Sequence, residues 1–483
     1  MAVETRAESA LHRPPPAFDL LRLPLVGPLL RWRWGRLVFQ IPLLAIAALI
    51  IYDGLTGPQL APENTATVLA WIHYRGLVVL ALLLAGNLFC KGCPFVLPRT
   101  LARKLSLGGR RWPKALRNKW LAIGLLFLIF FLYEWLDLWA SPWLTAWLAV
   151  AYFVAAFALE ALFAESAFCK YVCPLGSFNF VSSTISPLQI VARDTQVCRT
   201  CVNKECVTGS AETLGCGTEL FVPQITSNLD CVFCLDCARA CPHDNVALAP
   251  RAPLKELAAP DSWRRRWDLG FLALVFAFAS LSNAFGMVPP VYELEILLAE
   301  RLRTNSEAVL LLLIFGGANL VLPALLGLGA ARLSQVFAGP AKRESLRAVF
   351  ARYAPAVIPL AFAVWLAHYG FHFATGALTI VPVFQNFLLD HRVSLLGAKP
   401  DWTLGAILPF SWLLPLQTII LLVGLAGSLY VVGERHKRAR PHPPGPGLLA
   451  IVPWVVLFLA LTVAAAYLFA LPMEMRGTVQ FLY

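Results

Sequence analysis

Apolar runs long enough to cross a lipid bilayer recur along most of this 483-residue chain. A bilayer core of about 30 Å needs about 20 mostly apolar residues in one helix, because a helix rises about 1.5 Å per residue. Within lipid, helices satisfy all their backbone hydrogen bonds internally, so runs of this length indicate helices. We expect about nine spans, at residues 37–55, 67–89, 120–140, 143–166, 267–289, 307–331, 354–373, 409–433 and 448–470.

Composition supports the same fold class. Hydrophobic residues make up 58% of the chain and charged residues 14%, whereas a soluble domain carries about a quarter charged residues. The predicted fold class is an all-α polytopic membrane protein. The C-x2-C-x2-C-x3-C-P run at Cys231–Pro242 adds a cytoplasmic, two-cluster ferredoxin-like segment to this prediction. Residues 1–36 are proline-rich and basic, and no small-residue cleavage site accompanies the first span, so we expect no cleavable signal.

Lysine and arginine gather in the loops that follow the second, sixth and eighth predicted spans. The loop after the second span carries nine of them, whereas loop 56–66 carries none. Since basic loops stay in the cytoplasm, the N-terminus and segment 167–262 are predicted to be cytoplasmic, and the C-terminus periplasmic, in a bacterial inner membrane. This bias explains the net charge of +12 better than nucleic-acid binding does.

Eight of the twelve cysteines lie between Cys198 and Cys241. The last four have the spacing C-x2-C-x2-C-x3-C-P, which holds a [4Fe–4S] cluster in bacterial ferredoxins. The fourth cysteine of that run ligates the neighbouring cluster, so two interleaved groups of ligands are expected. One group is Cys198, Cys201, Cys206 and Cys241, and the other is Cys216, Cys231, Cys234 and Cys237.

The first half of this segment fits the ferredoxin spacing less closely. Cys206 lies two residues later than the standard spacing places it, and Gly217, not proline, follows Cys216. Cys198-x2-Cys201 is also a spacing found in zinc sites, so zinc is the alternative for this group. Disulfides are not expected, because cytoplasmic thiols stay reduced.

The other four cysteines end two predicted spans, and a proline that stops the helix follows each pair. These boundary cysteines are Cys90 and Cys93 in the first pair, and Cys169 and Cys173 in the second. Two such units in tandem suggest duplication of a two-span hairpin. We expect the four thiols to form one additional site, either a metal or cluster site or a pair of redox-active dithiols. Lys91 and Lys170 would favour the thiolate form. The alternative is that the thiols are buried and inert.

Six ionisable residues are predicted toward the periplasmic ends of the spans. They are His73, Arg75, Glu134, Asp137, His368 and His372. Ionisable residues at membrane depth are candidates for function. A quinol and proton site is one interpretation, and haem or copper ligation is another. His368 and His372 share one helix face, so they cannot bind opposite sides of one haem. The plainer alternative is interfacial snorkelling and interhelical hydrogen bonds.

Several of these elements resemble one protein family. The stretch Arg31–Gln40, Cys93-Pro94, Cys173-Pro174-Leu175-Gly176 and the double-cluster segment are similar to NosR/NapH-type membrane-bound polyferredoxins, which are related to CcoG-type proteins. The resemblance covers roughly residues 30–260. The chain departs from the family at its first pair, which is C-x2-C-P where the family usually has C-x3-C-P, and it has no periplasmic flavin domain before the first span. The predicted domains are a tail (1–36), a four-helix core (37–166), the iron–sulfur segment (167–262) and a five-helix membrane domain (263–483).

The resemblance implies electron transfer, as a subunit of an oxidoreductase system. Electrons would pass between a cytoplasmic donor or the quinone pool and a partner redox enzyme. A CcoG-like copper reductase and assembly factor, or a redox sensor, are the alternatives. The expected cofactors are two [4Fe–4S] clusters, with a further metal, haem or quinone as an open question. The expected partners are membrane lipid, the quinone pool and a partner redox subunit or reductase, and no nucleic acid.

Overall fold

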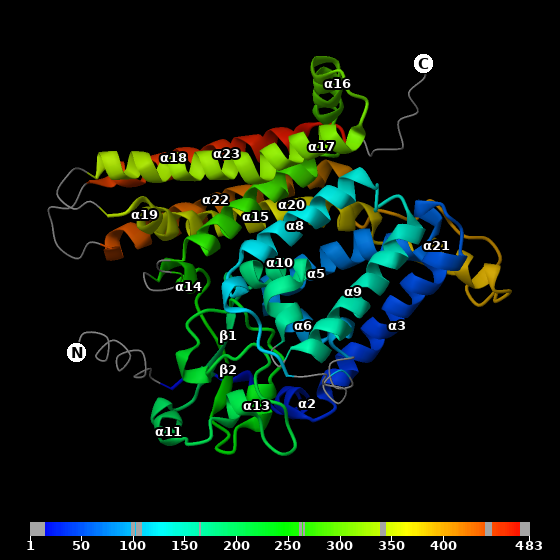
Figure 1. The fold of residues 1–483 in the computed structure, drawn as a ribbon. Helices are drawn as coiled ribbons and strands as arrows, with labels where there is room; N and C mark the ends of the chain where they lie inside the picture. The colour runs from blue at the N-terminus through cyan, green and yellow to red at the C-terminus, as the bar shows by residue number, and fades with distance from the viewer. Residues whose placement is uncertain are drawn as a thin grey trace. The chain divides into compact units, whose positions relative to one another are not determined.

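The computed structural model describes residues 15–97, 102, 109–163, 166–259, 263, 266–338, 344–439 and 447–473. The chain divides into two compact units, each built from three stretches of sequence. Unit 1 comprises Met1–Ala47, Ala81–Arg117 and Ala151–Glu256, and unit 2 comprises Ala48–Leu80, Asn118–Val150 and Leu257–Tyr483. Helices α3 (Gly35–Thr56) and α9 (Pro142–Leu162) contribute residues to both units (Figure 1).

The structure is mostly helical, and eight helices in its described part are long and apolar enough to cross a membrane. They span Gly35–Thr56, Thr65–Ala85, Pro142–Leu162, Trp267–Phe285, Glu307–Phe337, Leu346–Gly376, Phe410–Arg438 and Leu448–Ala470. These helices coincide with eight of the nine predicted spans. The predicted polytopic, all-helical character of the membrane part is therefore confirmed.

The remaining predicted span, 120–140, contains a shorter helix. Helix α8 (Trp120–Trp135) has 16 residues, which corresponds to a length of about 24 Å against a hydrocarbon core of about 30 Å. A second short apolar helix, α21 (Ile380–Asp390), lies where the sequence suggested a loop. Many of the basic loop residues, in 98–101, 103–108, 339–343 and 440–446, and the C-terminal end lie outside the described residues.

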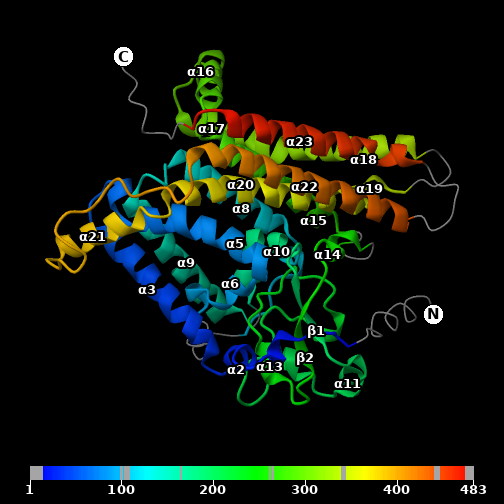
Figure 2. The same ribbon diagram turned by 180° about the vertical axis from the view of Figure 1, so that it is seen from behind.

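Unit 2 is a helical bundle with two enclosed helices. Its long elements are α15 (Trp267–Phe285), α17 (Glu307–Gly316) with α18 (Leu322–Phe337), α19 (Leu346–Tyr353) with α20 (Ile358–Gly376), α22 (Phe410–Ala439) and α23 (Val452–Ala470). Helix α15 packs against α18, α20 and α23, and α22 packs against α20 and α23 (Figures 1 and 2). In the apolar stretches that are long enough to cross a membrane, 83% of the residues of α15 and 89% of those of α19–α20 are buried, whereas 33% are buried in α17–α18. The first two therefore form the centre of the bundle.

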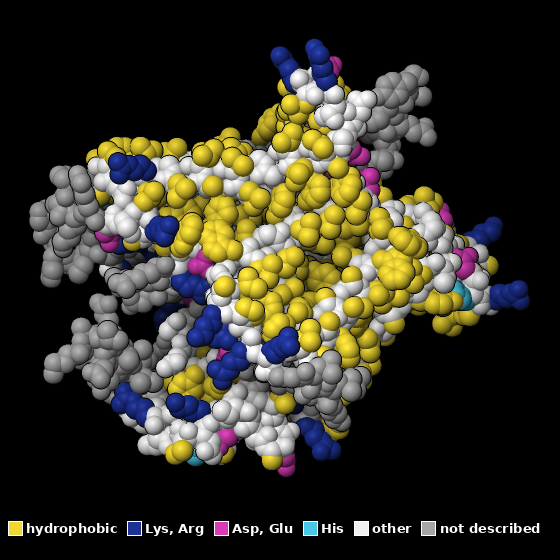
Figure 3. Space-filling model, viewed as in Figure 1, with side chains coloured by type: hydrophobic (Ala, Val, Ile, Leu, Met, Phe, Trp, Pro, Cys, Tyr) yellow, Lys and Arg dark blue, Asp and Glu magenta, His cyan; other side chains and the backbone are white. Residues whose placement is uncertain are grey.

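The outer helices of unit 2 expose apolar side chains. Along α18, Leu322, Leu325 and Leu328 are exposed, and hydrophobic atoms cover this helix in the space-filling view (Figure 3). A soluble monomer rarely exposes contiguous apolar patches larger than a few hundred Å². A helix that is apolar on all sides suits a lipid environment, so this surface agrees with a membrane location.

Helices α20 and α22 approach each other closely at small residues. A Cβ atom built on Gly424 would lie 2.3 Å from the Cβ of Ala363. One turn further along α22, the hydroxyl of Ser428 accepts a hydrogen bond of 3.0 Å from the backbone N–H of Leu360. Small residues four apart allow helices to pack tightly inside membranes, so Gly424 is required by this contact.

We expect Gly424→Leu to destabilise the bundle by about 1–3 kcal/mol or more, because overpacking forces neighbouring groups to move. Gly433→Leu in the same helix is the matched control, since no atom lies within 4 Å of its added Cβ. Unfolding of both variants in detergent micelles measures the difference. Equal stability of the two variants would show that the close approach at Gly424 does not matter.

Unit 1 contains a small two-stranded sheet that joins the two ends of the cysteine-rich segment. Strand β1 (Leu188–Ala192) pairs antiparallel with β2 (Val246–Pro250), with Leu188 opposite Pro250 and Ala192 opposite Val246. The short helices α11 (Thr195–Thr200), α12 (Glu205–Thr208) and α13 (Asp236–Ala240) lie between the strands in sequence. The pairing places residues just after β1 beside residues just before β2, which brings the first and last cysteines of the segment together.

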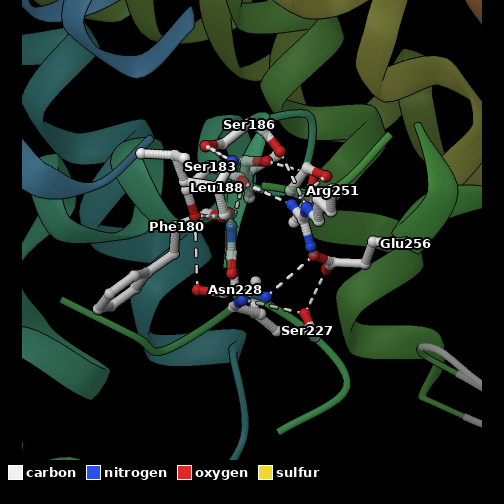
Figure 4. Close-up of polar contacts among 11 residues, drawn as sticks. Phe180, Ser183, Ser186, Leu188, Ser227, Asn228, Arg251 and Glu256 are labelled. Atoms are coloured by element: carbon white, nitrogen blue, oxygen red, sulfur yellow. Dashed lines mark hydrogen bonds and ion pairs between the residues drawn. The ribbon is translucent and has the colours of Figure 1, made fainter. Parts of the chain in front are cut away.

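A buried ion pair fixes this segment to helix α10 (Pro174–Ser183). The side chains of Arg251 and Glu256 are 3% and 1% exposed and pair directly. The Arg251 guanidinium also donates to the carbonyl oxygens of Ser183, Thr184 and Ser186, at 3.0, 2.8 and 2.8 Å (Figure 4). These carbonyls lie at and just after the end of α10, where no intrahelical donor remains. The network therefore caps α10 and anchors the chain that follows β2.

The carboxylate of Glu256 holds the loop before Cys231. It accepts hydrogen bonds from the hydroxyl of Ser227 and, at 2.9 Å, from the backbone N–H of Asn228 (Figure 4). The Asn228 amide in turn donates to the carbonyls of Ser183 and Leu188, at 2.9 and 2.8 Å. The start of the C-x2-C-x2-C run is thus fixed to α10 and to β1.

Candidate functional site

All twelve cysteines lie in unit 1 and all are in the thiol form. The structure brings the eight thiols of the 198–241 segment into two groups. The first group combines cysteines from both ends of the segment, because β1 and β2 fold the segment back on itself. The membership of each group follows from the hydrogen bonds and electrostatic neighbours of the sulfur atoms.

The first group is organised by Asn245, the residue before β2. Its Nδ2 donates to the Sγ of Cys198 at 3.2 Å, and its backbone N–H donates to the Sγ of Cys241 at 3.4 Å. Burial raises the pKa of Cys198 to about 11, although the hydrogen bond from Asn245 lowers it. The neighbouring thiols of Cys206, Cys241 and Cys201 also raise this pKa. The four thiols assigned to one group from the sequence therefore lie near one another.

The second group contains Cys216 together with the first three cysteines of the ferredoxin-type run. Burial raises the pKa of Cys237 well above its ordinary value, and the charges of Cys234, Cys216 and Cys231 raise it further. The Sγ of Cys216 accepts a hydrogen bond of 3.4 Å from the backbone N–H of Leu220. Cys216 thus lies near the run of cysteines that follows it, and its backbone N–H also donates to the carbonyl oxygen of Cys206 at 3.0 Å.

The backbone around Cys234 has an unusual conformation. Phe233 and Leu235, on either side of it, have positive φ angles of 48° and 63°. Positive φ is uncommon for residues other than glycine and costs energy at bulky side chains. Turns that include left-handed residues direct successive N–H groups into a concavity, and such nests recur at iron–sulfur sites. Nothing in the residue types Phe and Leu signals this conformation.

The thiols of the two groups are not gathered around one point. Among the residues that the structure describes, no three His, Cys, Asp or Glu side chains are grouped closely enough to hold one metal ion. A zinc ion draws four ligands to about 2–2.3 Å from itself. A cubane spreads its ligands farther apart, since each thiolate binds a different iron, and it does not require such a close group. The donor set of four thiols in each group fits a [4Fe–4S] cluster.

The four boundary cysteines also lie together in unit 1. Burial raises the pKa of Cys169 well above its ordinary value, and Cys173, Glu160, Cys93 and Cys90 raise it further. Both prolines of these pairs begin a helix rather than only ending one. Pro174 is the first residue of α10, and the Sγ of Cys173 accepts a hydrogen bond of 3.1 Å from the backbone N–H of Gly176 in its first turn.

The expectation that nearby lysines favour the thiolate form is wrong. Burial raises the pKa of Cys90 to about 12, and the charge of Cys93 raises it further, although hydrogen bonds from Asn179 and Asn87 oppose this. The ammonium groups of Lys91 and Lys170 donate to the backbone carbonyls of Leu30 and Thr218, at 2.9 and 2.7 Å. Burial therefore dominates, and in the metal-free protein Cys90 is a thiol at neutral pH.

Arg75 is the centre of a buried polar cluster in unit 2. It is 6% exposed, and its guanidinium donates to the hydroxyl of Tyr133 at 3.1 Å. The guanidinium also lies over the rings of Trp71, Tyr133 and Tyr369, at 4.6, 4.2 and 5.0 Å from their centroids. These aromatic residues were absent from the sequence-based candidates, although Tyr133 and Tyr369 directly neighbour Glu134 and His368. Aromatic faces stabilise a buried cation.

Glu134 and the two histidines of α20 belong to the same cluster. Glu134 is 3% exposed, lies within electrostatic reach of Arg75 and accepts a hydrogen bond of 3.4 Å from Asn283. His368 and His372 are also within reach of Arg75. Their Nε2 atoms lie 3.2 Å apart, so one ring can donate a hydrogen bond to the other. The Nδ1 atom of His368 is buried and has no hydrogen-bond partner among the described residues.

His73 and Asp137 have local roles instead. The two ring nitrogens of His73 lie 3.1 and 2.9 Å from the carbonyl oxygens of Val68 and Ala377, which occupies both of its potential ligand atoms. Asp137 lies in the turn after α8 with a positive φ of 44°, and its carbonyl oxygen accepts from the N–H groups of Ala140 and Ser141. Of the six predicted residues, four are brought together.

Comparison of the chain with protein-family models, with curated proteins and with solved structures found no match. The assignment of function therefore depends on the residues and on their geometry.

Proposed function

We propose that this protein is a membrane-bound iron–sulfur electron-transfer protein of the NosR/NapH polyferredoxin type. It passes electrons between a cytoplasmic donor or the quinone pool and a partner redox enzyme in a bacterial inner membrane. The observation that supports the proposal most is that Cys201, Cys206 and Cys241 lie near Cys198, and that Cys216, Cys231 and Cys234 lie near Cys237, because these are the neighbours that a two-cluster ferredoxin spacing calls for. Two [4Fe–4S] clusters, when bound, supply one-electron chemistry.

The residues around the thiols would tune such a site. Asn245 and the backbone N–H of Leu220 donate hydrogen bonds to cysteine sulfurs. Hydrogen bonds to the sulfurs, burial and net charge set the reduction potential of an iron–sulfur site. Because burial raises the pKa of Cys231 and of Cys237 in the metal-free protein, loading of iron onto these two thiols must release protons, and it becomes more favourable as pH rises.

The boundary cysteines would form an additional, thiolate-rich metal site. Their four thiols lie together and make no disulfide. Soft thiolate ligands select iron–sulfur clusters, zinc or Cu(I). In this proposal, electrons would pass through this site on their way between the soluble clusters and the membrane.

The Arg75 cluster would serve proton exchange with a quinol. A quinol that loses two electrons also loses two protons, and a nearby base must accept them. His368 and His372 share a hydrogen bond, and the buried Nδ1 of His368 lacks a partner in the described part of the chain. Arg75 and Glu134 supply the charges that would orient such a headgroup.

The proposed orientation makes a prediction about the C-terminus. With nine crossings, a reporter fused after Tyr483 lies in the periplasm, so fused alkaline phosphatase is active and fused green fluorescent protein is dark. If the 16-residue α8 does not cross the bilayer, eight crossings remain and both results reverse. A parallel fusion in loop 56–66, expected outside in either case, controls for expression and export.

Membrane vesicles test the proposed electron transfer itself. Oxidised vesicles receive a reduced quinol analogue, and low-temperature EPR follows the appearance of reduced iron–sulfur signals. We expect reduction in wild-type vesicles and a loss of at least about tenfold in rate for Cys90→Ser/Cys169→Ser, with both soluble signals retained. Absence of quinol-dependent reduction would contradict the quinone assignment. Reduction of Cu(II) by chemically reduced vesicles would instead favour the copper-reductase alternative.

A further inference from the structure

Asn87 lies at the N-cap position of a short helix, but its side chain does not cap that helix. It is the residue before helix α6 (Leu88–Lys91), and asparagine at this position normally caps the helix with its side-chain oxygen. Here it makes no capping hydrogen bond, although it is fully buried. Its Nδ2 instead donates to the carbonyl oxygen of Cys231 at 2.9 Å, a residue far away in the sequence.

The same residue contacts the first boundary cysteine. The carbonyl oxygen of Asn87 accepts a hydrogen bond of 3.0 Å from the backbone N–H of Cys90. One buried residue therefore joins the backbone of Cys231, in the second thiol group, to the backbone of Cys90.

Close packing holds this connection in place. Gly86, the preceding residue, has a positive φ of 62°. A Cβ atom on Gly86 would lie 2.3 Å from the Oγ of Ser186 and 3.3 Å from the ring of Phe233. Only glycine adopts this conformation and fits this space without cost. The turn at Gly86 and Asn87 is thus pressed against the loop that contains Cys231 and Cys234.

A second asparagine offers a comparison within the same site. Asn179, on α10, donates from its Nδ2 to the Sγ of Cys90 at 3.4 Å. Asn179 is buried like Asn87, but none of its hydrogen bonds reaches Cys231. Both residues therefore contact Cys90, Asn179 at its sulfur and Asn87 at its backbone, and they differ in the side-chain link to the second thiol group.

We propose that Asn87 is a positioning residue that couples the second thiol group to the boundary cysteines. Through its side chain it holds the Cys231 backbone, and through its carbonyl oxygen it holds the Cys90 backbone, in one hydrogen-bonded path. With an iron–sulfur cluster bound at Cys231 and a metal centre bound at Cys90, this path would carry one electron from the first to the second, with no transfer of atoms or protons. The inference rests on the proposed function. The hydrogen bonds on which it is based form within the protein itself and involve no cofactor.

Asn87→Leu and Asn179→Leu test this coupling as a matched pair in the full-length protein. Leucine has the same branched skeleton of four side-chain heavy atoms as asparagine, and its side chain forms no hydrogen bonds. After rapid chemical reduction of the soluble clusters, their reoxidation by a quinone analogue is followed by EPR. We expect Asn87→Leu to slow reoxidation at least about tenfold and Asn179→Leu by less than about threefold, with unchanged iron content in both. Equal rates for the two variants, or a wild-type rate in Asn87→Leu, would overturn the proposal.

Hydrogen exchange provides a readout that needs no metal. In the metal-free protein, the peptide that contains Cys231 should exchange several-fold faster in Asn87→Leu and at the wild-type rate in Asn179→Leu. Asn87→Ala, which cannot clash, replaces the leucine variant if that variant does not fold. If wild-type protein binds no iron, the proposed function fails, while hydrogen exchange still decides whether Asn87 holds the loop. Unchanged exchange in both Asn87 variants would overturn the positioning role.

Discussion

Replacing Cys241 with serine is expected to give the same spectroscopic loss as replacing Cys198, and a different loss from replacing Cys237. Cys241 belongs by sequence to the C-x2-C-x2-C-x3-C-P run with Cys237, but Asn245 joins its sulfur to that of Cys198. Each single replacement should lower the iron content from about eight toward about four atoms per chain, because one of two clusters is lost. EPR of the anaerobically purified variants distinguishes which cluster remains.

Cys216→Ser provides the reciprocal comparison. Its sulfur belongs to the second group, so its spectrum should match that of Cys237→Ser and differ from that of Cys241→Ser. A Cys241→Ser spectrum that matches Cys237→Ser would show that the ligands are not interleaved. That result would contradict the arrangement in which the pairing of β1 with β2 brings Cys241 close to Cys198.

Arg251→Met is expected to destabilise unit 1 by about 3–5 kcal/mol, because removal of one partner leaves a buried charge without compensation. Glu256 is almost fully buried, and the carbonyls of Ser183, Thr184 and Ser186 would lose their donor. The loop before Cys231 should loosen as well, since Glu256 holds Asn228. Chemical unfolding in detergent, followed by tryptophan fluorescence, measures the loss.

Lys437→Met is the control for this prediction. Its ion pair with Glu434 is 74% exposed on the lysine side, and exposed pairs contribute about 0–1 kcal/mol. The double variant Arg251→Met/Glu256→Leu should recover part of the loss, because it removes both buried charges. If Arg251→Met is as stable as Lys437→Met, the buried network does not fix this region.

The membrane helices could be predicted from the sequence because their signal is local. Long apolar runs have one stable form in lipid, and eight of them became helices of spanning length. The end of α8 was overestimated, since the residues after Trp135 remain apolar while Asp137 adopts a left-handed conformation that ends the helix. Helix α21 was missed because its 11 residues are too few for a spanning signal.

The candidate sites could be predicted only in part, because only some of their features have a local signal in the sequence. The cysteine spacing is local and indicates which thiols belong together. Asn245 and Asn87 act on cysteines through contacts between residues distant in sequence, and a single asparagine carries no signal of such a contact. The left-handed conformations at Phe233 and Leu235 are imposed by the packed loop and oppose the preferences of those residues.

Iron and acid-labile sulfide analysis of the anaerobically purified full-length protein, combined with low-temperature EPR of the reduced form, is the decisive measurement. We expect about eight iron and about eight sulfide per chain in the 198–241 segment, with signals from two interacting [4Fe–4S] clusters. Iron beyond this amount would be assigned to the boundary cysteines through the loss of that excess in Cys90→Ser/Cys169→Ser. Stoichiometric zinc with little sulfide would contradict the iron–sulfur assignment and the electron-transfer function proposed from it.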